Sequence, residues 1–156
     1  MFLSSLKSGP RPDFFVGARM YPLLVTAAII VHEGKVLLTR RKADVPYPLL
    51  WEFPGGKVEP AEDPHDCIVR EIREELAIQV GVAGIYDVIY HRYPERTVLV
   101  LAYRCLWLSG EIIDQDVEEH RWALPCDLGK FELLPADVQL AEKIRMEFAD
   151  AYFTSL

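Results

Sequence analysis

Apolar and β-branched residues form two long runs near the start of the chain, with a short polar break between them. The runs cover residues 23–32 and 35–41, and each predicts a β-strand. The break is Glu33–Gly34, a dipeptide typical of a two-residue hairpin turn. Residues 43–56 contain three prolines and two glycines, so we expect mainly a loop there, with a short strand near Trp51–Phe53.

Two helices are predicted from capping residues and from periodicity. Asp63–Pro64 places a capping carboxylate before a proline at the first helical position, so a helix should run from there to about Ile78. Near the end of the chain, a mostly apolar stripe recurs at helical spacing and predicts a second helix. Its members are Val138, Ala141, Ile144, Arg145 and Phe148.

Strand patterns return between the two helices. Residues 85–90, 97–108 and 120–124 are rich in β-branched and aromatic side chains, which predicts three further strands. Gly81 and Gly84 punctuate the segment before the first of them. This order of elements, without repeats or a linker, predicts one α/β domain.

Length and charge narrow the range of functions. A chain of 156 residues fits one domain, and 24 Asp and Glu against 17 Lys and Arg give a net charge of −7. Such acidity argues against binding polymeric nucleic acid, although a small phosphorylated substrate bridged by metal ions remains open. No apolar run approaches the roughly 20 residues that span a bilayer, and the three cysteines fit free thiols in a reducing compartment. We therefore expect a cytoplasmic protein without a membrane partner.

The first 19 residues differ from the rest of the chain. They lack the basic start and continuous apolar stretch of a signal peptide, and two glycines and two prolines interrupt them. A second methionine, Met20, stands just before the first strand pattern. We expect residues 1–19 to be a flexible or dispensable extension and residues 20–156 to form the domain.

The candidate chemistry lies on the first predicted helix. Glu71, Glu74 and Glu75 are three or four residues apart, so their carboxylates project from one face. Crowding of this kind costs stability unless cations neutralise it, and hard ions such as Mg²⁺ prefer oxygen ligands. Taken alone, the helix fits equally well an exposed charged face in which Arg70 and Glu74 form an ordinary ion pair.

The residues before the helix favour the metal site. Residues 51–59 read Trp-Glu-Phe-Pro-Gly-Gly-Lys-Val-Glu, and together with the helix they resemble the Nudix box, Gly-x5-Glu-x7-Arg-Glu-U-x-Glu-Glu-x-Gly-U, where U is a bulky aliphatic residue. Eight of the nine defined positions match; they are Gly56, Glu62, Arg70, Glu71, Ile72, Glu74, Glu75 and Ile78. The departure is Ala77, where the family usually has glycine, and we expect it to require only a local adjustment at the end of the helix.

The resemblance covers residues 23–148 and is closest to the MutT branch of the Nudix hydrolases. It includes residues 37–41, 93–97 and 134–137, which read Leu-Leu-Thr-Arg-Arg, Tyr-Pro-Glu-Arg-Thr and Leu-Pro-Ala-Asp. The implied fold is the Nudix α/β/α sandwich, a mixed β-sheet between helices with the box as a loop-helix-loop.

The resemblance also implies roles at the metal. Glu71, Glu74, Glu75 and the carbonyl of Gly55 would bind Mg²⁺, with Mn²⁺ able to substitute, and Arg70 would orient the carboxylates with help from Glu62. A further ligand is expected before the late tryptophan. Asp116 is the first choice and Glu119 the second, and Glu71 is the first choice as general base.

The resemblance further implies which residues bind the substrate. Arg41 and Arg96 would contact it, although both could equally be solvated, and Phe53 could stack on a base. Asp137 stands where the branch commonly has a base-contacting Asn, and as an ionised group it would only accept hydrogen bonds. A carboxylate is also favoured there simply because a helix begins.

The implied reaction is hydrolysis of a nucleoside triphosphate to the monophosphate and pyrophosphate. The main prediction is a monomeric or homodimeric enzyme that clears oxidised nucleotides such as 8-oxo-dGTP from the pool used for DNA synthesis. A pyrophosphohydrolase acting on CTP, dCTP or 5-methyl-dCTP is the alternative within the enzyme class, because the Pro-Ala-Asp segment also resembles that subgroup. A non-catalytic Nudix domain that binds a nucleotide is the alternative outside it, but a pure binder has no need of all three box glutamates.

Overall fold

The structure is a computed structural model, which describes residues 21–153. Its first two strands, β1 (Leu23–His32) and β2 (Lys35–Arg40), form an antiparallel hairpin as predicted. Glu33 and Gly34 both have positive φ, 49° and 73°, which is the backbone that a type I′ turn requires. The predicted extension, residues 1–19, lies outside the described residues.

The remaining elements follow the predicted order, with two additions, strand β4 and a 3₁₀ helix. They are β3 (Trp51–Glu52), β4 (Gly55–Lys57), α1 (Pro64–Leu76), β5 (Gln79–Arg92), β6 (Thr97–Ser109), β7 (Glu119–Ala123), the 3₁₀ helix η2 (Pro125–Lys130) and α2 (Pro135–Phe153). The helix η2 was not predicted. Within residues 21–153, no helix is long and apolar enough to cross a membrane.

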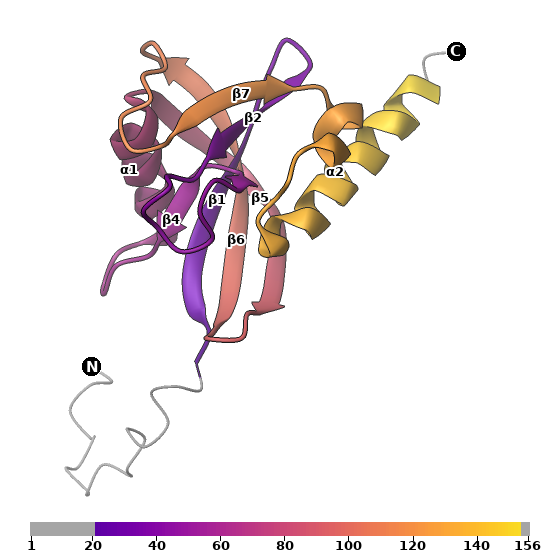
Figure 1. Cartoon of the computed structure of the whole chain (residues 1–156). Helices are drawn as coiled ribbons and strands as arrows, with labels where there is room; N and C mark the ends of the chain where they lie inside the picture. The colour runs from indigo at the N-terminus through magenta and orange to yellow at the C-terminus, as the bar shows by residue number, and fades with distance from the viewer. Residues whose placement is uncertain (1–20, 154–156) are drawn as a thin grey trace, which may run out of the picture.

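The strands form one mixed sheet in the order β3-β2-β1-β6-β5, with β4 paired to β1 and β7 paired to β2. The central pair β1–β6 is parallel, whereas the other pairs are antiparallel. Helices α1 and α2 lie on opposite sides of this sheet (Figure 1). The structure therefore confirms the mixed α/β sandwich implied by the resemblance.

Strand β1 shows how the sequence supplies two hydrophobic cores. Ala27 and Ile29 pack with α2 on one face of the sheet, while Ala28 and Ile30 pack with α1 on the other. Side chains alternate between the two faces of a strand, so a strand that is buried on both faces is apolar throughout. The continuous apolar run of β1 is explained by its position at the centre of the sheet.

Three details of the predicted elements differ in the structure, of which the adjustment at Ala77 was expected. Gly81 and Gly84 do not precede a strand but lie inside β5, where the pairing with β6 shifts register at several bulges. Helix α1 ends at Leu76 because Ala77 adopts the left-handed conformation, with φ of 59°. The buried face of α2 shares Ala141 and Ile144 with the predicted stripe, but Val138 and Phe148 are 47% and 37% exposed. Among residues 135–149 of this helix, the buried ones are Ala136, Asp137, Leu140, Ala141 and Ile144.

Candidate active site

Helix α1 begins where the sequence predicts, and its packing against the sheet sets the direction in which its carboxylates project. The side chain of Asp63 accepts a hydrogen bond from the backbone of His65 at 2.7 Å, and Pro64 occupies the first turn. The apolar side of the helix is fully buried against the sheet through Cys67, Ile68, Ile72 and Leu76. Because this side is anchored, the rotation of the charged residues about the helix axis is fixed as well.

Arg70 connects three carboxylates beside the helix. Its Nε and Nη2 donate to the two oxygens of Glu62 at 2.7 and 3.0 Å. Its Nη1 donates to Oε1 of Glu71 at 2.9 Å and to Oε2 of Glu74 at 3.1 Å. The hydrogen bond from Arg70 lowers the pKa of Glu62 to about 2. Arg70 therefore contacts Glu71 and Glu74 of the three box glutamates, whereas Glu75 accepts from the backbone of Gly55 instead.

The two glycines of the box lie where a side chain would not fit. A Cβ on Gly55 would lie 2.1 Å from the backbone oxygen of Thr26, and one on Gly56 would lie 2.4 Å from the carboxyl carbon of Glu71. The N–H of Gly55 donates to Oε2 of Glu75 at 3.3 Å. The glycines thus let β4 approach both β1 and the carboxylates of α1.

Burial and mutual repulsion raise the pKa of several acids at this site. The pKa of Glu75 is raised well above its usual value, first by burial and then by the charges of Glu52 and Glu71. Burial also raises the pKa of Glu52, although its ion pair with Arg41 at 3.0 Å opposes this. The pKa of Glu71 is raised by burial against the opposing effect of Arg70. The site is therefore short of positive charge.

The donor set suits a divalent cation in chemistry, although its side chains do not enclose one. Among residues 21–153, no three His, Cys, Asp or Glu side chains converge closely enough to hold a metal ion. Two of the predicted ligands, Glu71 and Glu74, are instead bonded to Arg70. All the candidate donors are oxygens, and hard cations such as Mg²⁺ prefer oxygen and offset such an excess of negative charge. The residues present therefore fit a divalent metal.

The two candidates for a further acidic ligand lie in different surroundings. The N–H of Asp116 donates to the carbonyl of Glu75 at 3.3 Å, and the charge of Asp116 contributes to the raised pKa of Glu75. The carboxylate of Asp116 accepts a hydrogen bond from Lys42 at 2.8 Å. Glu119 is instead bonded to Arg121 at 3.1 Å and lines a separate hollow. Asp116 therefore lies at the edge of the carboxylate cluster formed by Glu52, Glu71 and Glu75, and Glu119 does not.

A cavity of about 310 Å³ opens beside the carboxylates, on the α2 side of the sheet. Strands β1, β3, β4 and β6 supply part of its wall, and the loops on either side of β3, the turn before β6 and the start of α2 supply the rest. Its lining includes Arg41, Tyr47, Glu52, Phe53, Arg96 and Asp137. The four residues predicted to bind the substrate are thus brought together from four segments of the chain.

Asp137 occupies a buried position at the start of α2. It is 4% exposed, and its Oδ2 accepts a hydrogen bond from the backbone of Phe53 at 2.9 Å. Burial, followed by the charge of Glu52, raises the pKa of Asp137 to about 8. A protonated carboxyl can donate as well as accept a hydrogen bond, so burial favours a form of Asp137 other than the ionised acceptor expected from the sequence.

The other predicted substrate residues contribute in different ways. The ring of Phe53 lines the cavity but is 2% exposed and packs in the core with α2, so it offers little surface for stacking on a base. Arg96 is exposed at the cavity, on a turn closed by the hydrogen bond from Tyr93 to its carbonyl at 2.8 Å. Arg41 lines the cavity while its guanidinium is bonded to Glu52.

Two residues of the site were not predicted from the sequence. Glu52 lies at the junction of the carboxylates and the cavity, and its signal was the presence of one acid between the buried aromatic residues Trp51 and Phe53. Tyr47 lines the cavity from a proline-rich loop, and no periodicity marked it.

Comparisons with known proteins agree with this geometry. The family model for the NUDIX domain matches residues 21–145. The CTP pyrophosphohydrolase of Escherichia coli (strain K12) is 38% identical over 119 residues, which cover 76% of this chain and 87% of that protein. The 8-oxo-dGTP diphosphatase of the same organism is 27% identical over 127 residues, which cover 81% and 98%. In three dimensions, the solution structure of the E. coli ORF135 protein superposes with a TM-score of 0.71 at 35% identity, over 79% of this chain and 88% of that one.

Proposed function

The chain belongs to the NUDIX family and is a Nudix hydrolase, and on this premise we propose that it hydrolyses nucleoside triphosphates to the monophosphate and pyrophosphate. One observation carries the proposal, which is that the carboxylates and the cavity lie next to each other. A carboxylate cluster short of positive charge adjoins a cavity of about 310 Å³ through a shared residue, Glu52. A triphosphate with its metal ions suits the cluster, and a nucleoside suits the cavity.

We assign the metal to the oxygens of Glu71, Glu74, Glu75 and the Gly55 carbonyl, with Asp116 as a further ligand. A bound Mg²⁺ or Mn²⁺ supplies charge neutralisation at the phosphate oxygens and lowers the pKa of an attacking water. Arg70 serves to hold the carboxylates in a fixed arrangement, since it bonds to Glu71 and Glu74 directly.

Glu71 is our choice for the group that takes the proton of the water. Arg70 engages its Oε1 at 2.9 Å, and we assign Oε2 to the proton. Partial burial raises the pKa of this carboxyl, which brings it closer to the working pH that favours a general base. Gly56 supports this role because its lack of a side chain makes room for the carboxylate.

The main substrate that we propose is an oxidised purine nucleotide such as 8-oxo-dGTP, cleared from the cytoplasmic pool before it can enter DNA. Asp137 supports it, because a carboxyl with a pKa of about 8 can donate to a carbonyl such as guanine O6 at neutral pH. CTP or its deoxy and 5-methyl forms are the second candidate. The 38% identity to a CTP pyrophosphohydrolase favours them, and an amino group of cytosine can donate to the same carboxyl.

A substrate panel tests both substrates together. Pyrophosphate release is measured with Mg²⁺ for 8-oxo-dGTP, dGTP, CTP and 5-methyl-dCTP, on the wild type and on Asp137→Ala. Loss of one buried hydrogen bond to the base should lower kcat/KM by a factor that corresponds to about 1–3 kcal/mol. The decrease should differ from one substrate to the next across the panel. If the relative rates of the four substrates stay the same in the variant, Asp137 does not select the base.

A further inference from the structure

Pro46 and Tyr47 line the cavity from the segment of residues 46–50, between β2 and β3, which was expected only to connect strands. Tyr47 and Leu49 both adopt the left-handed backbone conformation, with φ of 55° and 60°. L-residues rarely adopt it, and Tyr47 also precedes Pro48, a position that normally favours extended backbone. Strain of this kind persists only where surrounding contacts impose it, and it concentrates at ligand-binding positions.

The contacts that impose it come mainly from Arg41. Its Nη2 donates to the carbonyl of Pro46 at 2.6 Å, and its Nε to the carbonyls of Pro46 and Tyr47 at 3.0 and 3.2 Å. Its Nη1 donates to Glu52 at 3.0 Å, so one guanidinium joins this loop to the carboxylate cluster. The backbone of Arg41 also exchanges hydrogen bonds with Leu49 and Leu50, at 3.1 and 2.9 Å. Arg41 therefore holds this loop through both its backbone and its guanidinium.

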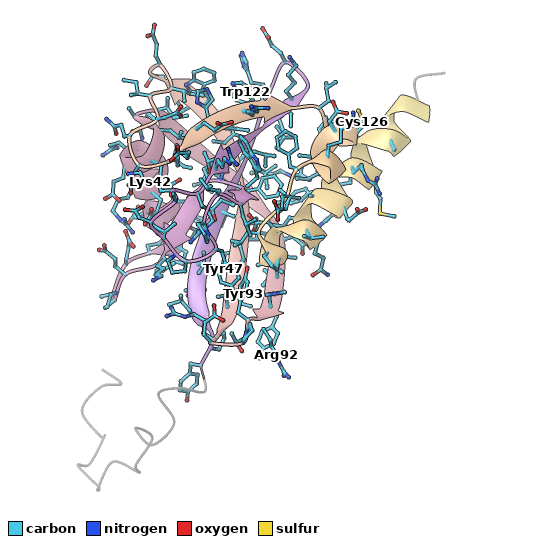
Figure 2. The ribbon with its side chains drawn as sticks, in the orientation of Figure 1. Lys42, Tyr47, Arg92, Tyr93, Trp122 and Cys126 are labelled. Carbon is cyan, nitrogen blue, oxygen red and sulfur yellow. The ribbon has the colours of Figure 1, made fainter. Side chains whose placement is uncertain are left out.

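The ring of Tyr47 is held on its far side as well. It packs on Tyr93 with ring centroids 4.9 Å apart, and Glu95 beside its hydroxyl raises the pKa of Tyr47. Figure 2 shows Tyr47 and Tyr93 beside each other at one end of the sheet. The hydroxyl of Tyr93 in turn accepts from the backbone of Ala136 at 3.0 Å, next to Asp137. The aromatic pair thus connects the loop to the start of α2, where the base-reading carboxyl lies.

We propose that Tyr47 is a specificity-determining residue whose ring stacks on the base, and that Arg41 is the positioning residue that holds it there. The proposal rests on the proposed function, since it requires a nucleotide in the cavity. A base presents an edge to hydrogen-bonding groups and a flat face to aromatic rings, and Asp137 can serve only the edge. The ring of Phe53 is 2% exposed, whereas Tyr47 is half-buried and lines the cavity. Tyr47 is therefore the better stacking partner for a base.

The test compares substrates with and without a base. KM and kcat are measured for CTP, 8-oxo-dGTP and ribose 5-triphosphate, on the wild type, Tyr47→Ala and Tyr47→Phe. Loss of base stacking should raise KM of Tyr47→Ala for the two nucleotides by about 10-fold to 100-fold, with kcat changed less than about threefold. KM for ribose 5-triphosphate, which has no base, should move by less than about threefold. Tyr47→Phe keeps the ring and should recover most of the lost affinity.

Two further variants separate stacking from positioning and from general effects. Tyr90→Ala removes a tyrosine that is 55% exposed on β5 and should leave KM for every substrate at the wild-type value. Arg41→Lys keeps the charge but loses the planar fork, so it should raise KM as Tyr47→Ala does and also lower kcat, because Glu52 loses its partner. Calorimetric Kd values for CMP and 8-oxo-dGMP should rise in Tyr47→Ala by the same factor as KM.

The outcomes are distinguishable. If the wild type hydrolyses no nucleoside triphosphate, the proposed function fails. If it does so and Tyr47→Ala keeps wild-type KM and Kd values, the assignment of Tyr47 fails alone. An equal rise in KM for ribose 5-triphosphate would also overturn base stacking, because the effect would then lie on the triphosphate.

Discussion

The substitution Gly56→Ala should displace the carboxylate of Glu71 without disturbing the fold. In Gly56→Ala, the new Cβ would lie 2.4 Å from the carboxyl carbon of Glu71 and 2.5–2.6 Å from its oxygens. Ordinary contact begins at 3.4 Å, so the carboxylate must withdraw by about 1 Å. The carboxylate is the far end of a flexible side chain, and the helix behind it is anchored by buried residues. The fold should therefore survive while Glu71 leaves its place.

The cost can be estimated from this displacement. A misplacement of about 1 Å at a catalytic group commonly lowers the rate by about 100-fold, which corresponds to about 2.7 kcal/mol. We expect kcat for pyrophosphate release to fall by about that factor in Gly56→Ala, with a melting temperature within a few degrees of the wild type. The assays are steady-state kinetics with Mg²⁺ and thermal unfolding followed by circular dichroism.

Two other glycines serve as matched controls. Gly129→Ala places its Cβ in open space and should leave both activity and stability unchanged. Gly55→Ala places its Cβ 2.1 Å from the backbone oxygen of Thr26, so it should lower the melting temperature as well as the rate. A kcat within threefold of the wild type in Gly56→Ala would refute the role of Glu71, since the carboxylate could then move without consequence.

Three further predictions address the helix, the metal site and a buried acid. Glu74→Gln and Glu75→Gln each remove a charged oxygen donor without changing the shape of the side chain. Pyrophosphate release should therefore fall by orders of magnitude, while the circular dichroism spectrum stays native. Near wild-type rates in both variants would contradict the metal assignment. Ala77→Gly relieves the backbone strain of the left-handed C-cap and should raise the free energy of unfolding by roughly 0.5–1 kcal/mol in urea titrations. The control Ala149→Gly, inside α2, should lower it by a similar amount. A less stable Ala77→Gly would show that the cap is not strained. Burial raises the pKa of Asp137 to about 8, so the folded protein binds one more proton than the unfolded chain between about pH 4 and pH 8, and this carboxyl lowers the free energy of unfolding as the pH rises through that window. Asp137→Asn should therefore gain stability over the wild type from pH 5 to pH 8, and a difference independent of pH would mean that Asp137 is ionised in the folded protein.

The sequence by itself determined whatever depends on neighbours along the chain. The turn at Glu33–Gly34 and the cap at Asp63 act within a few residues, and the structure has both. The spacing of Glu71, Glu74 and Glu75 put them on one helix, because helical geometry depends only on local periodicity. The Nudix-box motif then identified the family, because its defined positions are also set by spacing along the chain.

The tertiary structure alone decided which distant segments meet. Glu52 reaches the box carboxylates only because β3 pairs with β2, and Asp137 bonds to Phe53 across 84 residues of sequence. On α2, packing against the sheet buried Asp137 and left Val138 exposed, and the backbone N–H of Phe53 satisfies the buried carboxyl. Local pattern specifies elements, but register, pairing and the choice of a buried face depend on long-range contacts whose partners no local period encodes.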